Sequence, residues 1–409
     1  MKTVSEPSSN SLAHLPVVTL KKRRAQPFFN QHPWVFAGAV SHINREPEPG
    51  DEVVVRANDA KFIARGLFNP NSNIRVRLYS WDKKTPIDAA FWSARINEAI
   101  SLREACIDTE QNSAYRLIFS EADGISGLTV DRYNDWLMVQ ITSLAISERA
   151  ELLFDLLMER CQPRGIWLRT EKGIREAEGL ECRDGLVRGE EPPPSLTIRE
   201  NGLPFLVNPA EGQKTGCFLD QRENRRAVAS YVARHRVLDA FSYAGGFGIT
   251  AAKLGAAASV VCVDSSESAL DLARANAEAN GVTDRLEFVR SDVFQYLEQC
   301  RDYGTQFDTV ILDPPKMARQ QKGIPNALRG YHGLNVLGAS LVKPGGLLVT
   351  CSCSGQVTRE DFRNVLAEVS TTTERRIQIL EARGLPADHP VSPNCPENDY
   401  LKCFVCRVN

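Results

Sequence analysis

From residue 209 onward the chain alternates between short apolar runs and helix-like stretches, and this alternation severely restricts the possible folds. Such alternation builds a parallel sheet, because each helix returns the chain to the start of the next strand through a right-handed crossover. The sequence therefore predicts an α/β domain with a doubly wound, Rossmann-like sheet. A Pro-rich loop before the last strand favours an antiparallel final hairpin. Helices are expected at 266–280 and 324–342, and strands at 237–241, 259–264, 286–290, 307–312, 346–351, 376–381 and 400–407.

Reactive side chains lie at or just after the ends of four of these strands. Asp239, Asp264 and Asp313 mark the first, second and fourth strands, and Cys351 and Cys353 mark the fifth. Since the carboxyl ends of parallel strands form one edge of a sheet, these groups are expected to meet at one ligand site. Carboxylates suit a ligand with ribose hydroxyls and a positive charge, and a cysteine adds a nucleophile. The pattern favours S-adenosylmethionine-dependent methyl transfer to a nucleic-acid base.

The loop after the first strand is rich in glycine, with Gly245, Gly246 and Gly248. Glycine lets the backbone approach a ligand closely, but a tight structural turn would need the same residues. Asp239 separates two ligand classes, because its carboxylate would repel a pyrophosphate and attract the cationic methionine end of S-adenosylmethionine. We therefore expect Asp239, Phe241 and Gly245 to bind this cofactor.

Two further carboxylates have both a functional and a structural interpretation. Asp264 can accept hydrogen bonds from ribose hydroxyls, as an acid at this position does in dinucleotide-binding sheets, or it can cap the helix that begins near Ser266. Asp292 can accept a bond from the adenine amine, or it can cap the helix that follows it. Both are expected in the cofactor site, with Asp313 beside them.

The motif Asp313-Pro314-Pro315-Lys316 follows the fourth strand. Its two prolines fix an extended backbone and remove two N–H donors, which leaves carbonyl oxygens facing the cleft to hold an amine of a planar base. Enzymes that methylate exocyclic amines usually carry an aromatic residue in the fourth position of this motif, where it stacks on the base. Lys316 stands there in this chain, which weakens the case for amine methylation.

The cysteines of the fifth strand provide a different chemistry. Carbon 5 of a pyrimidine is a poor nucleophile until a thiolate adds to carbon 6, and Cys351 or Cys353 could supply that thiolate. The alternative is that both are buried as small hydrophobic residues. Cys403 and Cys406 form a C-x-x-C pair in an apolar run without a second pair, so no metal site is expected.

The N-terminal quarter is basic, although the whole chain carries a formal net charge of −2. Residues 17–103 hold 14 Lys/Arg against 8 Asp/Glu, and short strands are predicted there at 53–56, 62–67 and 74–78. A solvated basic face is one interpretation, and attraction of RNA phosphates is the other, which basic residues on several strands favour. The expected RNA-binding residues are Lys21, Lys22, Arg23, Arg24, Arg75 and Arg77.

Changes in composition divide the chain into four parts. We expect a disordered tail at 1–16, a small β-rich domain at 17–95, a central α+β domain at 96–200 and the methyltransferase domain at 201–409. A hairpin is predicted around Asn201-Gly202. No apolar run is long enough to span a membrane. Eleven cysteines without a signal segment indicate reduced thiols and a cytoplasmic protein.

Several longer motifs resemble the bacterial 23S ribosomal RNA cytosine-C5 methyltransferases that carry an N-terminal PUA domain. The resemblance covers nearly the whole chain from residue 17. It implies a PUA-like RNA-binding domain, a central domain and a class I methyltransferase sheet. The motifs are H-P-W-V-F-A-G-A at 32–39, E-A-D-G-I-S-G-L-T-V-D-R-Y at 121–133, K-T-G-C-F-L-D-Q-R at 214–222, D-H-P at 388–390 and Y-L-K at 400–402.

The resemblance also implies roles for single residues. The family's S-C-S-G run falls on 352–355, which makes Cys353 the expected nucleophile. Cys351 stays an alternative, since T-C-S marks the nucleophile in other RNA cytosine methyltransferases. Asp313 would hold the edge of the base and favour protonation of its ring nitrogen 3. The residues implied to border the cofactor pocket are Phe218, Asp220 and Arg222.

The partner implied by the resemblance is 23S ribosomal RNA, and a homodimer remains open. Two other functions are kept as alternatives. One is methylation of guanine N2 by a similar sheet, which would need no thiol. The other is a non-catalytic role in RNA binding or ribosome assembly on a methyltransferase scaffold.

Overall fold

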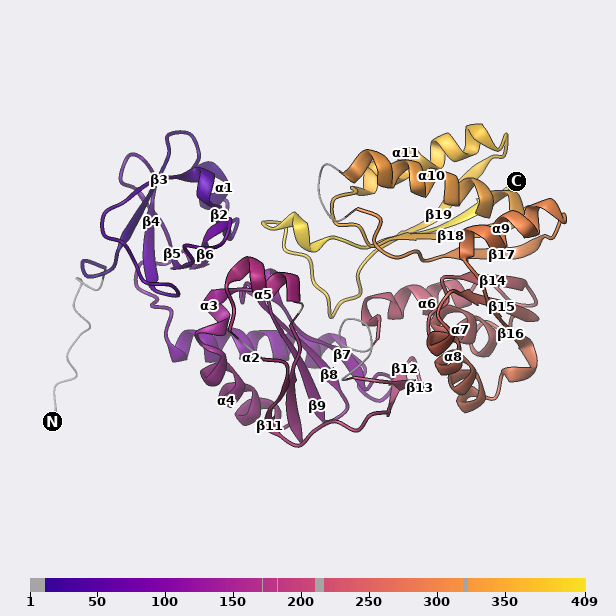
Figure 1. Cartoon of the computed structure of the whole chain (residues 1–409), viewed down its shortest axis with the longest axis horizontal. Coiled ribbons are helices and arrows are strands. Elements are labelled where there is room, and N and C mark those ends of the chain that lie inside the picture. Colours follow the sequence, from indigo (N-terminus) through magenta and orange to yellow (C-terminus); the bar gives the residue numbers. More distant parts are fainter. Residues whose placement is uncertain (1–11, 171, 182, 210–216, 319–322) are drawn as a thin grey trace. The chain divides into compact units, whose positions relative to one another are not determined.

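The computed structural model describes residues 12–170, 172–181, 183–209, 217–318 and 323–409, and Figure 1 shows the course of the chain. The described residues fold into two compact units. The first holds residues 12–106, 115–192 and 390–396 within these ranges, and the second holds residues 107–114, 193–389 and 397–409.

The N-terminal part of the first unit is a six-stranded sheet in the order β2-β6-β5-β4-β1-β3. Neighbouring strands run antiparallel except β1 and β4, which are parallel. Alternate apolar residues, such as Val53 and Val55, fill one core together with Phe28. The three strands predicted in this region are confirmed. The bounds are β1 Val17–Leu20, α1 Gln26–Phe29, β2 Trp34–Phe36, β3 Val40–Ile43, β4 Glu52–Arg56, β5 Phe62–Phe68 and β6 Ile74–Ser80.

The rest of the first unit is built on a five-stranded sheet in the order β11-β10-β9-β8-β7. Its longest helix, α2, buries Phe91, Ile96 and Ile100, which recur at helical spacing along one stripe. In the described part of the chain, no helix combines the length and the apolar character needed to cross a bilayer. The bounds are α2 Ala89–Cys106, β7 Ala114–Phe119, β8 Leu128–Tyr133, β9 Trp136–Ile141, α3 Leu144–Ser147, α4 Ala150–Cys161, β10 Gly165–Leu168, α5 Lys172–Glu178 and β11 Gly185–Gly189.

The second unit is a seven-stranded sheet in the order β16-β15-β14-β17-β18-β20-β19. The strands β14 to β18 are parallel, as the βαβ alternation predicts. β20 runs antiparallel to both β18 and β19, which confirms the expected final hairpin. The bounds are β14 Arg236–Ala240, β15 Ser259–Asp264, β16 Leu286–Arg290, β17 Phe307–Leu312, β18 Val342–Ser352, β19 Ile377–Arg383 and β20 Lys402–Val408.

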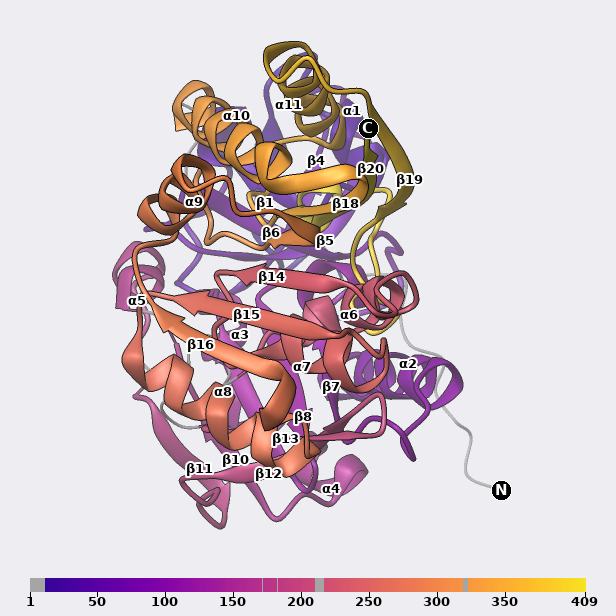
Figure 2. The same cartoon turned by 90° about the vertical axis from the view of Figure 1, so that its right-hand side faces the viewer.

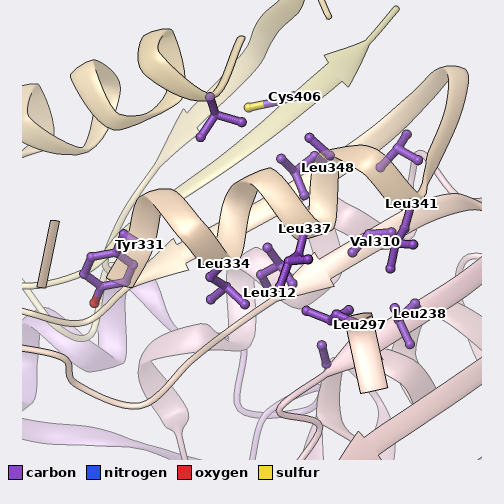
Figure 3. Close-up of a cluster of buried hydrophobic side chains, with 14 of the residues drawn as sticks. Leu238, Leu297, Val310, Leu312, Tyr331, Leu334, Leu337, Leu341, Leu348 and Cys406 are labelled. Atoms are coloured by element: carbon purple, nitrogen blue, oxygen red, sulfur yellow. The ribbon is translucent and has the colours of Figure 1, made fainter. Parts of the chain in front are cut away.

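Helices cover both faces of this sheet. Figure 2 shows α7 and α8 on one side of the strands and α9, α10 and α11 on the other. One core lies under the second group, where Tyr331, Leu334, Leu337 and Leu341 of α10 pack toward Leu312 and its neighbours on the sheet (Figure 3). Burial of each such side chain stabilises the fold by about 1.5–3 kcal/mol. The bounds are α6 Arg222–Ala229, α7 Gly246–Lys253, α8 Glu267–Asn280, α9 Val293–Asp302, α10 Ile324–Leu341 and α11 Arg359–Thr372.

The predicted hairpin is present as β12 Leu196–Glu200 and β13 Leu203–Val207. Asn201 and Gly202 both have positive φ, 52° and 77°, as a tight two-residue turn requires. The Leu206 N–H donates to Oδ1 of Asn276 on α8 at 2.6 Å, which ties the hairpin to the second unit. The longest segment of that unit, residues 193–389, includes both strands of the hairpin.

Candidate active site

The three predicted acids lie at the ends of three neighbouring strands, because the sheet runs β15-β14-β17. The strand order reverses at β14, and ligands of open α/β sheets bind at such a switch point. Asp239 is buried there and accepts a hydrogen bond from Gly248 N–H at 2.8 Å. Burial raises the pKa of its carboxyl to about 7. Asp264 and Asp313 are both partly exposed.

The glycines of the first loop are needed by the fold itself. A Cβ on Gly248 would lie 2.7 Å from Sγ of Cys262 and 3.1 Å from Oδ2 of Asp239. Gly245 has a φ of 78° and begins α7. The tight-turn interpretation therefore explains these glycines. Phe241 and Tyr243 in the same loop also have positive φ, 64° and 48°, and such strained backbone concentrates at functional sites.

Asp264 ties this loop to the second strand. Its Oδ2 accepts from Tyr243 N–H and its Oδ1 from Ser266 N–H, both at 2.9 Å. The cap of α8 is the Ser266 hydroxyl, which accepts from Ala269 N–H, so Asp264 is not itself the capping residue. Asp292 does cap its helix, since its Oδ1 accepts from Gln295 N–H at 3.1 Å. A carboxylate has further lone pairs, so neither role prevents a ligand from binding.

The segment that precedes α6 connects the loops of the sheet edge. Lys214, Thr215 and Gly216 lie outside the described residues. The Phe218 ring meets the Tyr243 ring edge to face, with centroids 5.3 Å apart. The Gln221 amide donates from Nε2 to Oδ1 of Asp313 at 2.9 Å. This segment therefore contacts both the first-strand loop and the motif after the fourth strand.

Two other residues of this segment are engaged inside the protein. Asp220 is buried and its Oδ2 accepts from the Tyr400 hydroxyl at 2.6 Å. Arg222 is buried and donates to both carboxylate oxygens of Asp388, at 2.9 and 3.2 Å. Burial opposes ionisation of Asp388, but hydrogen bonding to His389 and the Arg222 charge hold its pKa below the usual value. Arg222 is thus placed to fix the start of α6 and not to face a ligand.

Cys353 follows the end of β18, beside the motif of the fourth strand. Its thiol is partly exposed, and Sγ lies 3.9 Å from the carbonyl oxygen of Pro314. The next residue, Ser354, accepts hydrogen bonds at Oγ from the N–H groups of Met317 and Ala318, at 3.2 and 3.1 Å. The turn that carries Cys353 is therefore docked on the loop that begins at Asp313.

Cys351 has a different environment. It lies within β18, directly opposite Cys403 of β20, and is 0% exposed. Its hydrogen bond with Cys403 and its burial raise the pKa of the thiol well above the ordinary value. A thiol that is buried and resists ionisation is a poor nucleophile. The geometry favours Cys353 of the two cysteines.

Lys402 is a site residue that the sequence reasoning missed. It pairs with Ser352 in the β18–β20 ladder, is 1% exposed, and donates from Nζ to the carbonyl oxygens of Ser354 and Tyr400 at 2.8 and 2.9 Å. A signal was present, because Lys402 is followed by an unbroken apolar run, where a lysine is unexpected. Gln221 was also missed, although it stands between two residues that were selected.

The expected RNA-binding residues fall into two groups in the first unit. Residues 21–24 are all exposed. Arg75 is half-buried and donates to the Pro70 carbonyl. Arg77 is only 7% exposed, because its guanidinium pairs with Glu121 at 3.3 Å and Glu178 at 3.6 Å. The Arg77 side chain is therefore buried in ion pairs and is not on the surface that RNA could reach.

Comparison with known proteins assigns the two main parts of the chain. Residues 183–393 match the family described as S-adenosylmethionine-dependent methyltransferase, and residues 18–81 match the PUA-like domain. The chain is 41% identical over 392 residues to "Ribosomal RNA large subunit methyltransferase I" of Erwinia tasmaniensis, covering 95% of this chain and 98% of that one. It is 39% identical over 403 residues to the protein of the same name from Salmonella arizonae, with 98% and 100% covered.

Solved structures confirm the fold. The methyltransferase SMU.776, crystallised with SAH, superposes with a TM-score of 0.84 at 21% identity, over 96% of this chain and 99% of that chain. A methyltransferase from Streptococcus mutans gives a TM-score of 0.83, also at 21% identity. By its sequence relatives and the matching family, this chain belongs to the S-adenosylmethionine-dependent methyltransferases, among the proteins named ribosomal RNA large subunit methyltransferase I.

Proposed function

We propose that the protein methylates carbon 5 of a cytosine in 23S ribosomal RNA through a covalent bond between Cys353 and carbon 6. The observation that carries the proposal is the contrast between the two cysteines. The Cys353 thiol lies beside the Pro314 carbonyl at the edge of the sheet, whereas Cys351 is buried inside it. The names of the relatives support large-subunit ribosomal RNA as the substrate.

The chemistry follows from the residues around that thiol. The Cys353 proton passes to solvent, and the thiolate forms a bond to carbon 6 while Asp313 holds the base edge and favours protonation at nitrogen 3. The electrons of the 5,6 double bond make carbon 5 nucleophilic, and the bond that carbon 5 forms to the methyl carbon would replace the methyl–sulfur bond of the bound donor, which would leave as S-adenosylhomocysteine. The proton on carbon 5 then passes to water as the carbon–sulfur bond breaks, which restores both the double bond and the thiolate.

S-adenosylmethionine supplies the electrophilic methyl group when it is bound. The carboxylates at the strand ends fit this cofactor. We propose that Asp264 accepts from the ribose hydroxyls, that Asp239 faces the cationic end, and that Asp292 accepts from the adenine amine. The remaining proposed cofactor contacts are Phe218, Phe241, Gly245 and Asp313, with Asp220 and Arg222 supporting them from inside the protein.

RNA capture is proposed for the basic N-terminal domain. We place the PUA-like RNA-binding domain at 17–95, the central domain at 96–200 and the methyltransferase domain at 201–409. The exposed residues 21–24 would contact phosphates, because a cluster of unburied cations attracts RNA without desolvation of a paired charge. Arg77 is left out of this proposal because it is buried in ion pairs.

Bisulfite sequencing of ribosomal RNA from cells with and without the protein tests the proposal. A cytosine of 23S RNA that resists conversion only when the protein is present is the expected result. RNA containing 5-fluorocytosine should also trap the wild type as a covalent adduct, since fluorine at carbon 5 blocks proton removal, and should not trap Cys353→Ala. Methylation of guanine N2 by a thiol-free variant, or RNA binding without any methyl transfer, would support one of the alternatives instead.

A further inference from the structure

A lysine is buried directly behind the turn that carries Cys353. Lys402 lies on β20 opposite Ser352, and its ammonium donates to the carbonyl oxygen of Ser354 at 2.8 Å. The Ser354 hydroxyl in turn accepts from the loop after Asp313, and the Tyr331 hydroxyl lies 3.0 Å from it. Lys402 therefore holds the backbone one residue beyond the thiol.

The stability of the fold does not by itself require a charge at this position. Burial of a lysine side chain is unfavourable, and a similarly sized apolar residue is often better tolerated. Burial indeed lowers the pKa of Lys402 to about 8, while Asp399 and Cys353 favour the charged form and Arg359 opposes it. Because an electrostatic attraction is mutual, the ammonium favours the Cys353 thiolate as much as the thiolate favours the ammonium.

We propose that Lys402 is a positioning residue for Cys353, which fixes the turn through the Ser354 carbonyl and stabilises the thiolate through its charge. This inference rests on the proposed role of Cys353. Other charged or titratable groups act on the same region: Asp399 before β20, Arg359 and Asp361 at the start of α11, Tyr331 on α10, and Asp313 after β17, whose charge acts on Cys351 of the same strand end. Lys402 differs from these groups in being buried and bonded to the turn itself.

Alkylation of the full-length protein by iodoacetamide tests this inference without RNA or cofactor. The rate at Cys353 is followed against pH by peptide mass mapping, and the exposed Cys106 in the same sample serves as the reference. Lys402→Gln can still donate to the Ser354 carbonyl but has no charge, whereas Lys402→Arg keeps the charge. Thermal unfolding and S-adenosylmethionine binding show whether each variant is folded.

In the wild type, the midpoint pH for alkylation of Cys353 should lie below that of Cys106. Lys402→Gln should raise the Cys353 midpoint by about one pH unit, which is the lower end of the effect of a nearby opposite charge, and Lys402→Arg should leave it near the wild type. Lys402→Met serves as a second neutral variant if the glutamine variant is unfolded.

Equal midpoints for Cys353 and Cys106 in the wild type would overturn the inference, and so would an unchanged midpoint in a folded neutral variant. These results would leave the proposed function standing. That function is tested separately, since it fails if Cys353→Ala still forms 5-methylcytosine, whatever the alkylation profile of the wild type.

Discussion

Gln221 donates a hydrogen bond from Nε2 to Oδ1 of Asp313 at 2.9 Å and joins two segments that are 92 positions apart. The amide is itself oriented, because its Oε1 accepts from Nδ2 of Asn224 at 2.7 Å. One end of the side chain thus holds the proposed base-binding carboxylate, and the other is fixed on α6. The contact sets the direction in which Asp313 can meet a base.

The first prediction concerns this contact. Gln221→Leu should lower kcat/KM for methyl transfer roughly tenfold to a hundredfold, since a hydrogen bond to a charged group is worth about 1.5–3 kcal/mol. The Kd for S-adenosylmethionine should change little. Single-turnover kinetics with saturating cofactor measure the effect. A normal rate in the folded variant would show that Asp313 needs no help from Gln221.

The second prediction separates two strand-end acids. Asp264→Ala should weaken S-adenosylmethionine binding by about 1.5–3 kcal/mol, because charge-assisted bonds to the ribose are lost. Asp292→Ala should lose the proposed bond to the adenine amine and should also lower the free energy of unfolding by about 1 kcal/mol, because Asp292 caps α9. Calorimetric titration and denaturant unfolding of both variants give the comparison. Unchanged cofactor affinity in Asp264→Ala would restrict Asp264 to the backbone bonds that it makes in the loop.

The third prediction is a pH effect at Asp239. Burial raises the pKa of this carboxyl in the folded protein to about 7 from its ordinary value of 3.8. Between these two pH values the folded state holds more protons than the unfolded state, so this group's contribution to stability falls as pH rises. A cation bound beside Asp239 favours its ionised form and should expel the proton.

Calorimetry of S-adenosylmethionine binding at pH 6, in two buffers of different ionisation enthalpy, measures the number of protons released on binding. Release of close to one proton is expected from the wild type and much less from Asp239→Asn. If both proteins release the same amount, Asp239 does not face the cationic end of the cofactor.

The fourth prediction concerns the buried pair of Arg222 and Asp388. Arg222→Met should cost about 3–5 kcal/mol of unfolding free energy, because it leaves a buried carboxylate without its cation. The double variant Arg222→Met/Asp388→Leu should recover most of this loss.

The pKa of Asp388 is lowered in the folded protein, so the stability that it contributes is present at neutral pH and is lost as pH falls below the unfolded value of 3.8. Urea unfolding at pH 7 and at about pH 2.5 should therefore show a larger drop in the free energy of unfolding for the wild type than for the double variant.

The fifth prediction tests RNA capture. Replacement of Lys21, Lys22, Arg23 and Arg24 by glutamine should weaken RNA binding. The slope of log K against log salt concentration should become shallower by about 3, because each of the four lost phosphate contacts removes about 0.7–0.9 from it. Cofactor affinity should stay the same. Arg77→Gln is the matched control. It should lower thermal stability, because a buried ion pair is broken, and it should leave the salt dependence of RNA binding nearly unchanged. An unchanged slope in the quadruple variant would show that residues 21–24 do not contact the RNA phosphates.

The strands of the α/β unit could be predicted because each is a short apolar run between turn or helix signals, as at 259–264 and 307–312. The carboxylates at their ends could be predicted for the same reason, since a parallel sheet gathers strand ends at one edge. The first and last residues of the strands were predicted less accurately. β18 begins at Val342, four positions before the predicted 346, because the residues around Gly345 and Gly346 lack the apolar signal.

The supporting residues of the site could not be predicted from local patterns. Gln221 reaches Asp313, and Lys402 reaches Ser354, only after distant segments have been brought together. Arg77 shows the opposite failure. The sequence predicted a strand at 74–78 and an RNA-binding role for Arg77, but not that Glu121 and Glu178 pair with its guanidinium. Which polar residues become buried depends on tertiary packing.

The position of β20 between β18 and β19 has a consequence for biosynthesis. Both neighbours precede β20 in the chain, so β18 keeps an uncovered edge until residue 408 has left the ribosome. Until then Lys402 cannot lie opposite Ser352, and the turn that carries Cys353 lacks its anchor. A nascent or prematurely terminated chain that ends before this strand therefore has an exposed edge on β18, and it lacks the hydrogen bond from Lys402 to the turn that carries Cys353.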